Sequence, residues 1–101
     1  MQVRIQSIHF DADQKLLQII ESKLQTFDQY LTKLEAEAKV ILKMEKVGQV
    51  SDKIVEIIVN LPGHPLIVKA KDKTFEKAFY MVLHSLKRQL LRFKEKLQQK
   101  H

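Results

Sequence analysis

The chain has 101 residues, of which 45% are hydrophobic and 30% are charged, and its formal net charge is +6 at pH 7. These values indicate a soluble, single-domain protein (residues 1–101) with one small core. The sequence contains no cysteine, which excludes disulfides, thiolate metal ligands and cysteine nucleophiles. Its apolar runs are far shorter than the roughly 20 residues of a membrane span, and its N-terminus lacks the layout of a signal peptide. We therefore expect a cytoplasmic protein.

The positive charge is concentrated in the second half of the chain. Residues 1–50 contain seven basic and seven acidic residues, whereas residues 51–101 contain eleven basic and five acidic ones. The last 18 residues contain one acidic residue, Glu95, and six basic residues: Lys87, Arg88, Arg92, Lys94, Lys96 and Lys100. A basic end on a compact domain indicates a polyanionic partner, either nucleic acid or an anionic membrane surface, and charge alone leaves both open.

Apolar alternation and periodicity predict the element order β-α-β-β-β-α. Period-two alternation predicts strands at 3–7, 38–47 and 66–71, and a β-branched run predicts another at 54–61. Turns are expected at 48–52 and 62–65. In the strand at 38–47, Val40, Leu42 and Met44 should share one face, with Lys43 and Glu45 on the other.

Two amphipathic helices complete the pattern. The first should begin after Asp13, a suitable N-cap, and should keep its apolar residues on one face: Leu16, Ile20, Leu24, Phe27, Leu31 and Leu34. The second should run from Lys73 or Thr74 to about Gln98 with this apolar stripe: Phe75, Phe79, Val82, Leu83, Leu86, Leu90, Phe93 and Leu97. The expected fold is α+β, a four-stranded sheet with both helices packed on one face.

Catalytic chemistry finds little support in the sequence. The only two glycines, Gly48 and Gly63, are too few for a phosphate-binding glycine loop. The four histidines (His9, His64, His84 and His101) form no i, i+4 pair and have no cysteine beside them, so we expect no metal site. The pair Asp11 and Asp13 is better explained by turn formation and helix capping than by acid–base catalysis. The sequence predicts no enzyme activity and no cofactor.

Basic side chains of the last helix should form a row. At 3.6 residues per turn Arg88, Arg92 and Lys96 align, while Lys87 and Lys94 lie on the opposite flank of the apolar stripe. Like charges at i, i+4 oppose helix formation by about 0.2–0.5 kcal/mol per pair. The row is therefore either a solvated face or a surface for a polyanion. On the outer face of the sheet, Arg4, Lys43, Lys69 and Lys71 should mix with Glu45 and Glu56, and no run of aromatics offers a stacking platform for bases.

Four stretches of the chain resemble the family of ribosome hibernation-promoting factors and ribosome-associated inhibitors, also called sigma-factor modulation proteins. Met1-Gln2-Val3 with Ile5 resembles the family's opening strand. Lys23-Leu24 with Phe27-Asp28-Gln29-Tyr30-Leu31 resembles the end of its first helix. Leu42-Lys43-Met44-Glu45-Lys46-Val47 resembles a family strand with one conservative change. Leu86-Lys87-Arg88-Gln89-Leu90, followed by Lys94-Glu95-Lys96-Leu97, resembles its last helix.

The resemblance implies a fold similar to double-stranded-RNA-binding domains and a non-enzymatic regulator of translation. Such a protein would dock on the small ribosomal subunit near the decoding region, overlap the sites of messenger and transfer RNA, and promote ribosome hibernation in resting or stressed cells. The implied partners are the small subunit and its ribosomal RNA, with no membrane and no small-molecule substrate. The implied RNA contacts are basic residues: Lys23, Lys43, Lys46, Lys87, Arg88, Arg92, Lys94 and Lys96.

The chain also departs from the family pattern. Residues 74–80 keep Ala78 but lack the acidic ends common at the start of the last helix, and Ser85 stands where a lysine is common. We expect these changes to affect the contact set and not the fold. Because the sequence stops at His101, the resemblance is to the short type of family member, which has no C-terminal dimerisation domain. The resemblance implies that such a protein pairs ribosomes only with the help of a second hibernation factor.

Two other functions stay open on the residues alone. One is a generic double-stranded-RNA-binding module without preference for ribosomes. The other is an interaction protein whose basic C-terminal helix binds an acidic protein partner.

Overall fold

The computed structural model describes residues 1–31, 36–63 and 65–99, with only the backbone described for 97–99. Along the chain the elements are β1 (Gln2–Ser7), α1 (Gln14–Gln25), η1 (Thr26–Tyr30), β2 (Glu37–Val47), β3 (Val50–Asn60), β4 (Leu66–Asp72) and α2 (Phe75–Gln99), where η1 is a 3₁₀ helix. This confirms the predicted order. The expectations for Leu34, His64, Lys100, His101 and the side chain of Leu97 fall outside the described residues.

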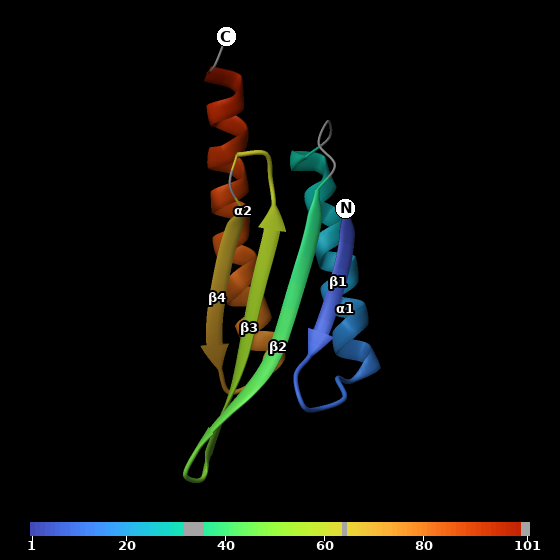
Figure 1. The fold of residues 1–101 in the computed structure, drawn as a ribbon, viewed down its shortest axis with the longest axis vertical. Helices are drawn as coiled ribbons and strands as arrows, with labels where there is room; N and C mark the ends of the chain where they lie inside the picture. Colours follow the sequence, from blue (N-terminus) through green and yellow to red (C-terminus); the bar gives the residue numbers. More distant parts are fainter. Residues whose placement is uncertain (32–35, 64, 100–101) are drawn as a thin grey trace.

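The four strands form one mixed sheet in the order β1-β2-β3-β4. The edge strand β1 is parallel to β2, whereas the β2–β3 and β3–β4 pairs are antiparallel. A parallel pair needs a crossover between its strands, and α1 lies in that connection. Figure 1 shows both helices behind the sheet with its other face uncovered, which confirms the predicted α+β architecture.

The core lies between the sheet and the two helices. From the sheet, the core includes the fully buried residues Val40 and Leu42 of β2 and Val55, Ile57 and Val59 of β3, whereas Met44, further along the same face of β2, is 45% exposed. The helices contribute the residues expected from their periodicity: Ile20 and Leu24 of α1, and Phe79, Val82, Leu86 and Leu90 of α2. Ala78 is buried beside them, while Phe75, Leu83 and Phe93 pack on the margin. This burial fixes how α2 is rotated about its axis.

The first helix is shorter than predicted. It begins as expected, with the Asp13 carboxylate accepting a hydrogen bond from the Lys15 N–H at 3.1 Å. It ends at Gln25, and the chain continues as the 3₁₀ helix η1. Contacts to the start of β1 hold this end, because the Gln25 amide donates to the Met1 carbonyl at 3.0 Å. The expectation of one long α-helix was therefore wrong after Gln25, although Phe27 and Leu31 are buried as the pattern required.

The turn between β2 and β3 is also tighter than predicted. Val47 pairs with Val50, so only Gly48 and Gln49 form the turn, and β3 includes residues 50–52, which were expected in the turn. Gly48 has φ +63°, a conformation that glycine adopts without strain and that two-residue hairpin turns favour at this position. Figure 1 shows the hairpin extending beyond the ends of β1 and β4.

Candidate nucleic-acid interface

The position of α2 is set by its cap and by its buried stripe. Thr74 accepts a hydrogen bond at its Oγ1 from the Lys77 N–H at 3.1 Å, so the helix begins at Phe75, close to the predicted start. Its 25 residues extend for about 37 Å along the long dimension of the molecule. With Phe79, Val82, Leu86 and Leu90 facing the sheet, the basic residues of the second half of α2 face solvent.

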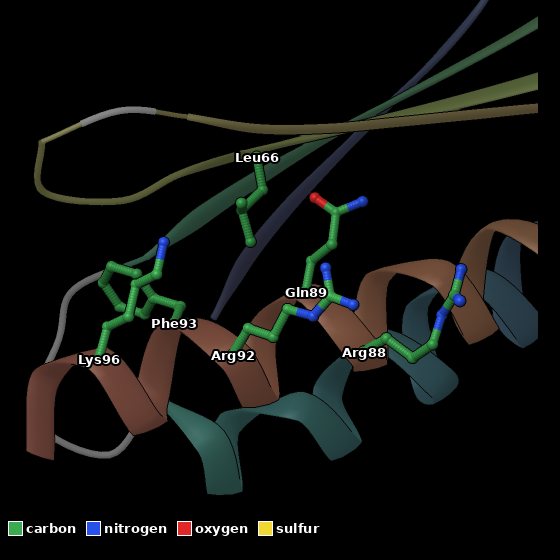
Figure 2. Close-up of a pocket in the computed structure, with 6 residues that line it drawn as sticks. All are labelled: Leu66, Arg88, Gln89, Arg92, Phe93 and Lys96. Atoms are coloured by element: carbon green, nitrogen blue, oxygen red, sulfur yellow. The ribbon is translucent and has the colours of Figure 1, made fainter. Parts of the chain in front are cut away.

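Arg88, Arg92 and Lys96 are exposed and line one groove between α2 and the beginning of β4. This α2–β4 groove has a volume of about 290 Å³ and is completed by Leu66, Gln89 and Phe93. In Figure 2, Leu66 points from the strand toward the helix, and Gln89, Arg92 and Lys96 point toward the strand side. The row predicted from helical periodicity is therefore one wall of a concave surface that also has apolar residues.

A second groove lies on the opposite flank of α2, where Lys23 of α1 and Lys87 of α2 meet. This α1–α2 groove has a volume of about 330 Å³, and its remaining lining comes from η1 and α2: Thr26, Phe27, Gln29, Tyr30, Leu83 and His84. Both lysines were predicted as RNA contacts, but the sequence did not indicate that they lie close together. Sequence reasoning also missed His84 and Tyr30 as groove residues, although His84 precedes Lys87 and Arg88 by about one helical turn.

The other predicted contacts are more dispersed. Lys94 is exposed on α2, two turns beyond Lys87, so it lies on the same flank. Lys43 pairs with Ile54 in the register of β2 and β3, on the sheet face turned away from the helices. Lys46 is exposed near the hairpin tip. The structure thus brings Arg88, Arg92 and Lys96 together and Lys23 together with Lys87, but it separates Lys43 from both groups.

The α2 cations have no carboxylate partner within the described part of the chain. The side-chain ion pairs of the described residues lie on the sheet, where Arg4 contacts Glu37 at 2.9 Å and Lys71 is 4.0 Å from both Glu45 and Asp52. Unpaired like charges spaced four residues apart do not stabilise a helix. Their arrangement is suited to binding phosphate oxygens, for which the forked donors of arginine are well matched.

Exposed apolar side chains accompany the cations on the outer side of α2. Tyr80, Met81 and Leu91 have exposed fractions of 44%, 50% and 38%. Helical periodicity places them outside the apolar stripe, so the sequence pattern gave no reason to expect a role for them. Single exposed apolar side chains are common on protein surfaces, so the cations and not these residues define the candidate interface.

The uncovered face of the sheet is less suited to binding nucleic acid than the outer side of α2 is. Lys43, Lys69 and Lys71 are on this face, as expected, but Glu45 and Glu56 are on it too. The four strands contain no aromatic residue, so they offer no platform for stacking bases.

The residues that the structure describes contain neither a candidate membrane-spanning helix nor a candidate metal-binding cluster. Among them, no helix is long and apolar enough to cross a membrane. No group of three or more histidine, aspartate or glutamate side chains in this part of the chain is placed to hold a metal ion.

Fold and surface together define a small basic α+β domain whose last helix carries exposed cations on its outer side. The sequence matches the family model described as "Sigma 54 modulation protein / S30EA ribosomal protein" over residues 3–98. The chain belongs to this family, as the resemblance predicted.

Solved structures of two bacterial proteins share the fold. The crystal structure of the Protein Y N-terminal domain from Thermus thermophilus has a TM-score of 0.78 and 26% identity, covering 92% of this chain and 99% of that one. A ribosomal subunit interface protein from Coxiella burnetii has a TM-score of 0.79 and 22% identity, covering 94% and 99%. A search of curated proteins gave no match.

Proposed function

We propose that the protein binds the small ribosomal subunit near the decoding region and promotes ribosome hibernation by excluding messenger and transfer RNA. The observation that carries the proposal is the set of exposed, unpaired cations on the two flanks of α2. Family membership supports a ribosomal partner, because the family description names a ribosomal protein and one structural relative is named a subunit interface protein. The proposed role is occupancy of a site and involves no reaction step.

Phosphate contacts account for the proposed affinity. Arg88, Arg92 and Lys96 would bind phosphates from one flank of α2, and Lys23 and Lys87 from the other, with Lys94 extending the second group. Each contact releases counterions from the RNA. Six contacts would lower the affinity by about 10³-fold as the salt concentration rises from 50 to 200 mM. Because phosphates carry no sequence information, the shape of the ribosomal RNA would determine where the protein docks.

Lys43 and Lys46 lie apart from the α2 cations, and we expect a smaller contribution from them. Both belong to the β2–β3 hairpin, and Lys43 is on the sheet face opposite the helices. They would contact RNA only where it continues around the hairpin. We therefore expect their replacement to affect subunit binding less than replacement of the α2 cations.

Co-sedimentation with purified small subunits tests the proposal. We expect the protein to pellet with the subunits at low salt and to be released as the salt concentration rises. Messenger RNA bound together with transfer RNA should compete with it. A protein that stays in the supernatant at all salt concentrations would disprove the proposal. Recovery from a lysate with mixed duplex RNA would favour a generic RNA-binding module, and recovery with an acidic protein alone would favour a protein-binding role.

A further inference from the structure

We propose that the α2–β4 groove holds one unpaired nucleotide of the bound RNA, with the base against Leu66 and Phe93 and the adjoining phosphates on Arg92 and Lys96. The inference rests on the proposed function, because it specifies which part of the RNA this surface takes. It adds recognition of a base to a surface otherwise described by phosphate contacts alone.

The shape and lining of the groove carry the first part of the argument. Its volume of about 290 Å³ is near the lower end of the range for small-ligand sites. Leu66 and Phe93 enter it from different elements, a strand and a helix. Paired bases inside an RNA duplex are stacked and cannot enter such a space. An unpaired base can turn outward and pack against an aromatic or aliphatic side chain.

Charge carries the second part of the argument. Arg92 and Lys96 are four residues apart on α2, which separates their backbone positions by about 6 Å along the helix axis. That separation is comparable with the distance between consecutive phosphates in an RNA strand. None of the six lining residues is acidic, so an anion in the groove would meet no repulsion from its walls.

Gln89 favours a base edge over a carboxylate as the group that it contacts in the groove. Its Nε2 donates a weak hydrogen bond of 3.5 Å to Ser85 Oγ, and its carbonyl oxygen accepts none from the described residues. The amide therefore offers one donor hydrogen and one acceptor, the pair that glutamine uses on base edges. A peptide carboxylate would use the donor and leave the acceptor unused.

The test compares three RNA duplexes of equal length by fluorescence anisotropy at low salt. One is fully paired, one has a single-nucleotide bulge, and one has an abasic residue in the bulge. We expect the protein to bind the bulged duplex about 5- to 150-fold more tightly than the other two, the range for one base stacked on an aromatic side chain. The lower end is expected because Phe93 is already half-buried. The abasic duplex should bind like the paired one.

Variants locate the preference in the groove. Phe93→Leu should remove most of the preference for the bulge and leave affinity for paired RNA unchanged, whereas Arg92→Gln should weaken binding of all three RNAs. Gln89→Ala provides a second test that leaves the apolar lining intact, and it should also reduce the preference. Melting temperatures of the variants establish that each is folded. Lys87→Gln, in the α1–α2 groove, is the matched control for Arg92→Gln and should retain the full preference.

Several outcomes would overturn the inference. These are equal affinity for all three duplexes, no binding to any of them, a preference that survives both Phe93→Leu and Gln89→Ala, and displacement of the bulged RNA by polyglutamate at a concentration similar to that of the RNA. Co-sedimentation with small subunits distinguishes a failure of the base-binding groove from a failure of the proposed function. A protein that pellets with small subunits but ignores the bulge refutes the base-binding groove alone.

Discussion

Replacing Arg88, Arg92 and Lys96 together by Gln separates a binding surface from a solvated one. All three side chains are exposed and lie outside the core, so the variant should remain folded. The replacement removes two like-charge i, i+4 contacts, and glutamine has a helix propensity similar to that of arginine and lysine. The free energy of unfolding should therefore stay the same or rise by up to about 1 kcal/mol.

The expected loss of RNA affinity follows from the number of phosphate contacts. Each contact contributes about 0.9 to the slope of log affinity against log salt, so three lost contacts should reduce the slope by about 2.7. At a salt concentration of about 0.15 M the same three contacts correspond to about a 100-fold loss in affinity for small subunits. Binding would be measured by co-sedimentation across a salt series, and stability by urea unfolding.

A variant with Lys15, Lys73 and Lys77 replaced by Gln is the matched control. These lysines are exposed, they lie outside both grooves, and their removal lowers the net charge by the same amount. We expect the control to lose less than about 10-fold in affinity, since it loses general attraction and no direct phosphate contact. Equal losses in the two variants would mean that only net charge matters. No loss in either would identify the α2 row as a solvated face.

Three further predictions concern the core, the second groove and the first helix. Leu86→Ala should lower the free energy of unfolding by about 2–5 kcal/mol, because Leu86 is fully buried, and an unchanged melting temperature would refute the register of α2. Replacing Lys23 and Lys87 together by Gln should weaken small-subunit binding by about 30-fold without changing the melting temperature, and full retention of binding would remove the α1–α2 groove from the interface. Asp13→Ala should destabilise the protein by about 0.5–2 kcal/mol in urea unfolding, and no loss would show that the cap is unimportant.

Local patterns predicted the elements well where burial is one-sided. The stripe of α2 was identified because a helix on a sheet buries one face, and Phe79, Val82, Leu86 and Leu90 are indeed buried. The N-cap at Asp13 was predictable because capping depends only on neighbouring residues.

Errors arose where contacts between distant residues decide the structure. The apolar spacing continues past Gln25, but the contacts of this segment with the start of β1 accompany a change to a 3₁₀ helix. The polar residues Ser51 and Asp52 resemble a turn, yet the hairpin ladder includes them because Gly48 and Gln49 close the turn alone. The strand order and the parallel pairing of β1 with β2 were not predicted, because they depend on the path of the crossover.

The candidate site also combines features set by local sequence with features set by tertiary packing. The row of Arg88, Arg92 and Lys96 follows from spacing within one helix. Its location opposite Leu66 depends on how α2 packs on β4, and the meeting of Lys23 with Lys87 depends on how α1 packs beside α2. The sequence therefore provided the basic residues, and the tertiary structure provided the two grooves that they line.

Chemical footprinting of the small-subunit ribosomal RNA, with and without the protein, would show where the protein docks. We expect protection of backbone and bases near the decoding region. This protection should disappear in the variant with Arg88, Arg92 and Lys96 replaced by Gln and should persist in the lysine control. Protection confined to another region of the subunit, or no protection under conditions in which the protein co-sediments, would contradict the proposed function.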